Sequence, residues 1–145
     1  MPMDDQTISN AQRLIKLLDC MRAKQPRSPL FEQLSEWGLS ISHLRLLSLL
    51  APDREVSMRE LAEALNVKPP SLTALTRRLV QTGLIERRPH PDDNRIILLS
   101  LSSRGRQLHH DLETERLARM TKLLAGLSHA EQQVFLDLLE RAMQT

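Results

Sequence analysis

Two short helical patterns lie close together in the middle of the chain, and this spacing restricts the fold more than any other feature. The first pattern is SMRELAEALN at 57–66, and the second, at 69–82, begins with two adjacent prolines. Only about three residues connect them, so the two helices must cross at a sharp angle. The sequence therefore predicts a helix–turn–helix.

Local chemistry sets the ends of both helices. Ser57 and Glu60 have the spacing of a capping box, in which each side chain bonds to the backbone amide of the other residue. Asn66 suits the left-handed conformation that ends many helices. Pro69 and Pro70 fit a first helical turn, because the amides they lack would have no partner within the helix.

A β-hairpin is predicted directly after the helix–turn–helix. The segments LIERR at 84–88 and RIILLSLS at 95–102 carry the only convincing β pattern in the chain. The loop between them, PHPDDN, is rich in the residue types that form turns. A hairpin in this position is the wing of a winged helix–turn–helix.

Helical patterns flank this unit on both sides. The first, at 7–25, is expected to end at the QPRSP segment (25–29), because a residue before proline is displaced from the α region. A short helix around 30–37 and a leucine-rich helix after Ser40 follow, and a long helix from about 102 to 125 precedes a last one that begins with the capping box at 128–131. The chain has only three aromatic residues and little β-branched sequence outside one stretch, so we predict a mainly α fold with a small β-wing.

The terminal helices are apolar over more surface than the small central unit could cover. A second copy related by two-fold symmetry is the commonest way to cover such stripes, and large exposed apolar patches are rare on monomers. The alternative is that these helices fold back to seal a monomeric core. We favour a single domain over 1–145, with dimerisation helices at 7–25 and 103–145 and a winged helix–turn–helix lobe at 30–102.

The outer face of helix 69–82 carries no acidic side chain. Opposite an inner row of Leu72, Leu75 and Leu79, this face presents short or basic side chains: Ser71, Thr73, Ala74, Arg77 and Arg78. A helix in a DNA major groove lies close to base edges and phosphates, so carboxylates there would be repelled and bulky apolar groups would clash. Small hydroxyls and a methyl group permit close approach, and free amides at the helix start favour a nearby phosphate.

Basic charge is concentrated in the same third of the chain. Residues 64–106 contain eight Lys or Arg against three Asp or Glu, which indicates a polyanionic partner, although a solvated surface would also explain it. Arginines bracket the wing loop, where a basic tip can enter the minor groove, and one of the two loop aspartates can bind and orient a nearby arginine. The predicted DNA-binding residues are Lys68, Pro70, Ser71, Thr73, Ala74, Arg77, Arg78, Arg87, Arg88 and Arg95.

Other classes of protein fit the sequence less well. A winged helix can dock another protein instead of DNA, but that would require apolar anchors on the outer face of helix 69–82, and there are none. There is no glycine-rich phosphate loop, no nucleophile elbow and no Cys–His or paired-carboxylate constellation, so we do not expect an enzyme. A single cysteine, an acidic N-terminus and no long apolar run indicate a soluble, cytoplasmic protein with no membrane partner.

The segment 61–105 resembles the core of MarR-type (multiple antibiotic resistance regulator) transcription factors. The shared features are the LAEAL helix, the following helix ending in RRL, TGLIERR, the Asp-x-Arg at 93–95, and LSLSSRG. The resemblance implies a homodimer with interlocked terminal helices that binds a pseudo-palindromic operator. It also implies repression released by a small acidic or aromatic ligand. Positions 71, 73 and 74 match those where family members contact DNA, and Arg95 matches the wing arginine.

Two positions depart from the family pattern. Position 74 is often arginine and is alanine here, so the operator sequence cannot be transferred. Position 68 is often a capping serine and is Lys68 here, which we expect to contact phosphate and not to cap.

Signal sensing is predicted less clearly. We expect no cofactor or metal site, and Cys20 to be a buried or half-buried inert thiol. Zinc or redox sensing on the same fold remains an alternative, with His109, His110 and Glu113 on adjacent turns, but neighbouring histidines diverge by about 100° on a helix. A small organic ligand between the helices is the third possibility, with these candidate lining residues: Met21, Trp37, His43 and Arg45.

Overall fold

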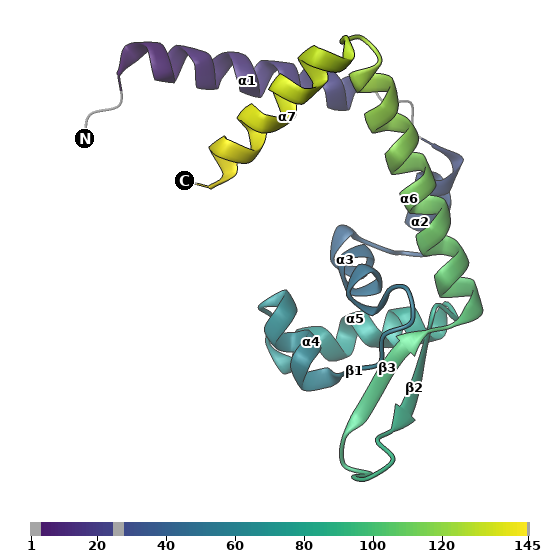
Figure 1. Ribbon diagram of the computed structural model, residues 1–145. Helices are drawn as coiled ribbons and strands as arrows, with labels where there is room; N and C mark the ends of the chain where they lie inside the picture. Colours follow the sequence, from purple (N-terminus) through teal and green to yellow (C-terminus); the bar gives the residue numbers. More distant parts are fainter. Residues whose placement is uncertain (1–3, 25–27, 145) are drawn as a thin grey trace. The chain divides into compact units, whose positions relative to one another are not determined.

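The computed structural model describes residues 4–24 and 28–144, which form seven helices and three short strands in two compact units (Figure 1). One unit comprises the described residues up to Trp37, with α1 (Asp5–Ala23) and α2 (Pro29–Glu36). The other begins at Gly38 and contains α3 (Ile41–Leu50), β1 (Val56–Ser57), α4 (Met58–Leu65), α5 (Pro69–Gln81), β2 (Ile85–Pro89), β3 (Ile97–Leu101), α6 (Ser103–Leu124) and α7 (His129–Met143). Residues 25–27, on which part of the predicted helix stop falls, lie outside the described residues.

The first unit consists of helices with polar caps. The Asp4 carboxylate accepts a hydrogen bond from the Thr7 amide at 2.8 Å, and the Ser28 hydroxyl accepts one from the Phe31 amide at 3.2 Å. No side chain of α1 is buried, and Cys20 is exposed on it. The prediction of a buried or half-buried thiol is therefore wrong for the single chain, because Cys20 lies on a helix that buries none of its side chains.

The helix–turn–helix forms with the predicted caps. The Glu60 amide donates to the Ser57 hydroxyl at 3.2 Å, and the Ser57 amide donates to the Glu60 carboxylate at 2.9 Å. Asn66 adopts the left-handed conformation with φ of 52°, and the two prolines occupy the first two positions of α5. The core beneath these helices is almost entirely leucine: Leu46, Leu47, Leu50, Leu61, Leu72, Leu79, Leu84, Leu99 and Leu101.

The wing is a three-stranded antiparallel sheet in the order β1-β3-β2. The predicted hairpin is confirmed, but β3 starts at Ile97 and not at residue 95. The two residues before it belong to the loop, because both bond back to Asp93. The Arg95 amide donates to the Asp93 carboxylate and the Ile96 amide donates to the Asp93 carbonyl, both at 3.0 Å. β1 was not predicted, since two residues are too short to show an alternating pattern.

α6 begins at the base of the hairpin, and α7 turns back from its far end (Figure 1). The Ser102 hydroxyl accepts from the Gly105 amide at 3.0 Å and donates to the Gly83 carbonyl at 2.6 Å, which ties the start of α6 to the turn after α5. Both helices match the predicted limits. α7 has no buried side chain, and its apolar residues are exposed in the single chain. No helix in the described part of the chain is both long and apolar enough to cross a membrane.

Candidate nucleic-acid interface

The outer face of α5 is exposed as predicted, with Ser71, Thr73, Ala74 and Arg77 accessible. The inner row differs from the prediction at one position. Leu75 is only half-buried, and Thr76 is buried with its hydroxyl donating to the Thr73 carbonyl at 3.0 Å. Positions 72, 76 and 79 share one face at the spacing of 3.6 residues per turn, which the sequence could have shown, and residue 75 lies at the edge of that face.

The first turn of α5 offers fewer amides to an anion than an ordinary helix start. Lys68 is the N-cap residue and its side chain makes no capping bond, as expected from its departure from the family pattern. Because Pro69 and Pro70 carry no N–H, Ser71 is the first helical residue that could donate one. An anion at this helix start would therefore find mainly the Lys68 ammonium and side-chain hydroxyls as donors. The Thr73 hydroxyl already donates to the Pro69 carbonyl at 3.0 Å, which leaves its oxygen free to accept.

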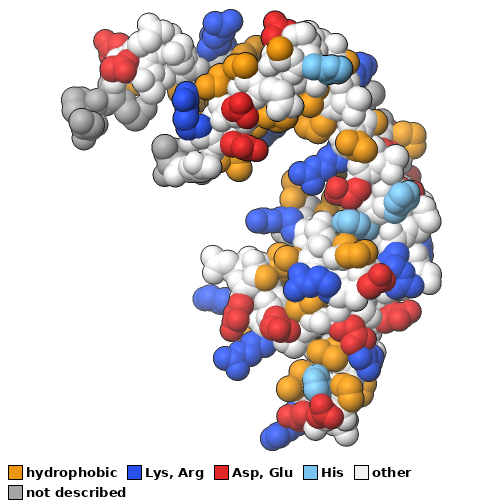
Figure 2. Space-filling view, in the orientation of Figure 1, with side chains coloured by type: hydrophobic (Ala, Val, Ile, Leu, Met, Phe, Trp, Pro, Cys, Tyr) orange, Lys and Arg blue, Asp and Glu red, His pale blue; other side chains and the backbone are white. Residues whose placement is uncertain are grey.

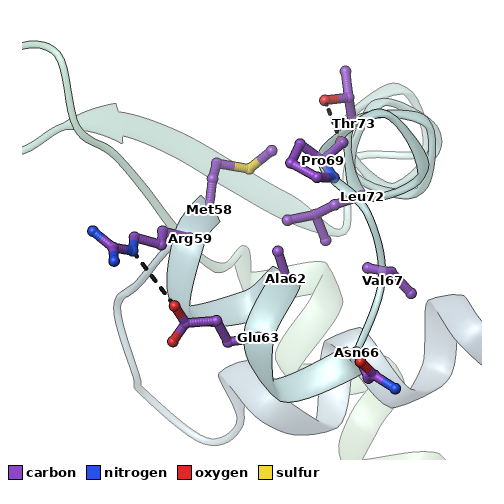
Figure 3. Close-up of a pocket in the computed structure, with 9 residues that line it drawn as sticks. All are labelled: Met58, Arg59, Ala62, Glu63, Asn66, Val67, Pro69, Leu72 and Thr73. Atoms are coloured by element: carbon purple, nitrogen blue, oxygen red, sulfur yellow. Dashed lines mark hydrogen bonds and ion pairs between the residues drawn. The ribbon is translucent and has the colours of Figure 1, made fainter.

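A groove of about 580 Å³ lies between α4 and the start of α5 (Figure 3). Met58 and Ala62 line it from α4, and Pro69 and Leu72 line it from α5, so its floor is apolar. The groove is produced by the crossing of two helices, and no local pattern in the sequence signals it. It places an open, apolar hollow directly beside the exposed first turn of α5.

The wing tip presents Arg95 to solvent. The Arg95 side chain is 91% exposed, and its Nε lies 3.2 Å from Asp93 Oδ1. Hydrogen bonds from the Arg95 backbone amide and then from its side chain lower the pKa of Asp93. The expectation that a loop aspartate binds a nearby arginine is thus confirmed for Asp93. Figure 2 shows acidic and basic side chains together at this tip, the lowest part of the view.

The other two wing arginines differ from each other. Arg87 is exposed on β2. Arg88, one position further along, binds Glu55 through both its Nε, at 2.6 Å from Oε1, and its Nη2. This hydrogen bonding lowers the pKa of Glu55 and raises the pKa of Arg88. Sequence reasoning missed the pair, because Glu55 lies 33 residues away.

Arg78 lies apart from the first turn of α5. A Cβ built on Gly38 would come within 3.4 Å of the Arg78 Cζ, so this guanidinium rests against the backbone just before α3. His43 on α3 is buried, with its Nδ1 accepting from the Ser40 amide at 2.9 Å. Burial, and secondly the charge of Arg78, lower the pKa of His43. The structure therefore brings Arg78 towards His43, a neighbour that the sequence did not suggest.

The four candidate ligand-lining residues are divided between the two units. Met21 and Trp37 are half-buried in the first unit, and His43 and Arg45 belong to the second. His43 and Arg45 are two residues apart on α3, so their side chains diverge by about 200° around the helix axis. His43 therefore points inward and Arg45 outward. Arg45 instead borders a shallow hollow of about 320 Å³ between α3 and α4. Among residues 4–24 and 28–144, no three His, Cys, Asp or Glu side chains converge to hold a metal ion.

Comparison with known proteins agrees with this architecture. The model of the MarR family matches residues 39–97, which run from the start of α3 into β3. The HTH-type transcriptional repressor MdtR of Bacillus subtilis is 30% identical over 127 residues, covering 88% of this chain and 79% of that protein. The chain belongs to the MarR family.

Two further similarities extend along most of the chain. The Bacillus subtilis HTH-type transcriptional regulator YdgJ is 34% identical over 104 residues, covering 72% of this chain, and the chain spans 63% of that relative's length. The crystal structure of the YusO protein from Bacillus subtilis superposes with a TM-score of 0.79 at 26% identity, covering 99% of both chains. The predicted mainly α winged-helix fold is thereby confirmed, and the chain is a MarR-family helix–turn–helix transcriptional regulator, not an enzyme.

Proposed function

We propose that this MarR-family regulator is a homodimer that binds a pseudo-palindromic DNA operator through α5 and the wing. One observation carries the proposal: α5 exposes a face without carboxylates, beside a wing whose tip extends Arg95 into solvent. The first feature favours close approach of a helix to the major groove, and the second allows the wing to contact phosphate or the minor groove.

The residues of this face divide by chemistry. Ser71, Thr73 and Ala74 are short enough to reach base edges, and the alanine methyl can contact a thymine methyl. Lys68 and Arg77 are long and charged, so we assign them to phosphates, where they supply affinity without sequence information. Pro70 keeps the first turn rigid, and Arg87 adds a further exposed charge on the wing. Arg78 and Arg88 are occupied by contacts within the protein and are weaker candidates.

The dimer is proposed from the apolar surface of the terminal helices, at 7–25 and 103–145. α1 and α7 have no buried side chain, and large apolar residues on them and on α6 are exposed in the single chain. These are Ile8, Leu14, Ile15, Leu17, Leu18, Leu117, Met120, Leu123, Val134, Phe135, Leu136, Leu138, Leu139 and Met143. Surfaces of this extent are rarely left uncovered, and two-fold pairing would present two lobes (30–102) to successive major grooves. Sedimentation of the full chain tests the oligomeric state.

Repression released by a small organic ligand is the regulatory part of the proposal. The similarity to MdtR, which is named as a repressor, supports repression. Release by a ligand rests on the family resemblance alone, with Met21, Trp37, His43 and Arg45 as candidate lining residues. A panel of metabolites, tested for release of the protein from its selected DNA, would identify such a ligand.

The decisive experiment measures DNA binding against salt concentration. Sequences selected from a random or genomic pool would be titrated with the wild type and with Arg95→Ala. We expect the substitution to weaken binding about tenfold and to make the salt slope shallower by about one unit, the loss of one cationic contact. Arg59→Ala is the control, because Arg59 is also exposed (90%) and paired with a nearby carboxylate, but lies on α4 and not among the predicted DNA contacts. Equal effects of both substitutions, or none from either, would contradict the proposed wing contact.

A further inference from the structure

We infer that Glu55 and Arg88 form a brace that holds the wing against the helix–turn–helix, so that Glu55 is a positioning residue for DNA binding and Arg88 does not bind phosphate. This inference rests on the proposed DNA-binding function. It assigns roles to an acidic residue that a DNA-binding surface would otherwise exclude, and to an arginine that the sequence placed among the DNA contacts.

The brace joins two parts of the lobe that are far apart in sequence. Glu55 directly precedes β1, and β1 leads without a loop into α4, the first helix of the helix–turn–helix. Arg88 lies on β2, and β3 runs between the two strands. In the register of the sheet, Leu98 of β3 is opposite both Arg88 and Ser57. Glu55 lies two residues before Ser57 and so on the same face, and the pair spans β3 on that face.

The contact has the geometry of a specific, oriented pair. The guanidinium uses two donors, Nε and Nη2, on the two oxygens of the carboxylate. Such fork-to-fork contacts constrain direction as well as distance. Because both side chains are 40–50% exposed, an effect on global stability is expected to be small. We therefore expect the brace to affect the geometry of the lobe. The strand that leads into α4 is β1, and only two residue pairs join it to β3.

Arg88 and Arg95 differ in how much of their charge reaches solvent. The Asp93 partner of Arg95 leaves that side chain 91% exposed at the tip, whereas Arg88 is half-exposed on β2, with a carboxylate covering two of its donors. A guanidinium whose positive charge is balanced by a bound carboxylate attracts phosphate only weakly. It can still fix the angle of the hairpin, on which the position of Arg95 relative to α5 depends.

The sign of one substitution separates this role from direct DNA contact. If Arg88 bound phosphate, Glu55 would compete for it and repel the DNA, so Glu55→Gln would strengthen binding. If the pair is a brace, Glu55→Gln removes an orienting contact and weakens binding, although it makes the protein more positive.

The experiment uses the full chain and its selected operator, titrated by fluorescence anisotropy over a range of salt concentrations. We expect Glu55→Gln and Arg88→Gln each to weaken binding about three- to tenfold and to change the salt slope equally, because both act through the same Arg95 contact. The double variant should be no weaker than either single one, since both lose the same contact. The exchange Glu55→Arg with Arg88→Glu should recover most of the affinity. Glu63→Gln is the control, because Glu63 is an exposed α4 carboxylate paired only along its own helix with Arg59.

A second cycle tests whether the brace acts through the wing tip. In an Arg95→Ala background, Glu55→Gln should cause no further loss, because there is no longer an arginine to position. The inference is overturned if Glu55→Gln leaves affinity unchanged or raises it, if Arg88→Gln lowers the salt slope by about one unit more than Glu55→Gln does, or if the exchanged pair binds more weakly than Arg88→Gln. A wild-type chain that binds no selected DNA would instead refute the proposed function, and with it the premise of the brace.

Discussion

Gly105 is the position where the structure makes its sharpest prediction about stability. This glycine lies in the first turn of α6, directly over the turn that follows α5. A Cβ added there would lie 2.0 Å from the Leu84 carbonyl oxygen and 3.0 Å from its carbon, and 3.3 Å from a methyl group of Leu101. Gly105→Ala therefore requires a backbone movement of at least about 1 Å, because neither carbonyl atom can rotate away like the end of a side chain.

The size of the effect follows from three contributions. Overpacking of a tight contact costs about 1–3 kcal/mol. The displaced Leu84 carbonyl also accepts a hydrogen bond from the Ser102 amide at 3.0 Å, and weakening it costs about 0.5–1.5 kcal/mol. Against this, alanine favours the helix over glycine by up to about 1 kcal/mol. We expect a net loss of about 2 kcal/mol in the free energy of unfolding.

Equilibrium urea denaturation, followed by circular dichroism, measures this loss. All variants must be compared at one protein concentration, because association would make the apparent stability concentration-dependent. Gly126→Ala is the matched control: the nearest atom to its new methyl group is the Leu123 carbonyl oxygen at 3.8 Å, an ordinary contact. That variant should stay within about 0.5 kcal/mol of the wild type. If Gly105→Ala were as stable as Gly126→Ala, the close approach of α6 to the turn after α5 would be refuted.

Two further predictions concern single residues of the lobe. Burial lowers the pKa of His43 below its ordinary value of 6.5, so the unfolded chain binds the proton more tightly than the folded chain does. The free energy of unfolding should therefore be largest above pH 6.5 and should fall as the pH drops towards the pKa of the folded state. Denaturation between pH 7 and pH 5 should show this decline in the wild type and a smaller one in His43→Gln, and identical profiles would exclude His43 as its cause. Asn66 has a φ of 52°, so Asn66→Val should lose about 1–2 kcal/mol while Asn66→Gly loses little, as read from urea midpoints; equal losses would show that backbone conformation is not the reason.

The sequence alone predicted the ends of most helices, because those ends depend on atoms three or four residues apart. The reciprocal bonds of Ser57 with Glu60, the left-handed Asn66 and the position of Pro69 all follow from local chemistry, and each is present. The acid-free face of α5 was equally visible, since a helical period alone determines which side chains share a face. The expected bond between Asp93 and Arg95 is also local, since donor and acceptor are only two positions apart in the sequence.

Only the tertiary structure decided which distant groups meet. β1 is a strand because it pairs with β3. Glu55 reaches Arg88 across β3, although the two residues are 33 positions apart. Arg78 rests against Gly38, a neighbour that no pattern in α5 could reveal. Cys20 is exposed on α1, a helix with no buried side chain, although the apolar pattern of that helix predicted a covered thiol. Short-range patterns determine where helices begin and which faces they bury, whereas contacts between elements depend on how the chain packs, and that depends on all the elements together.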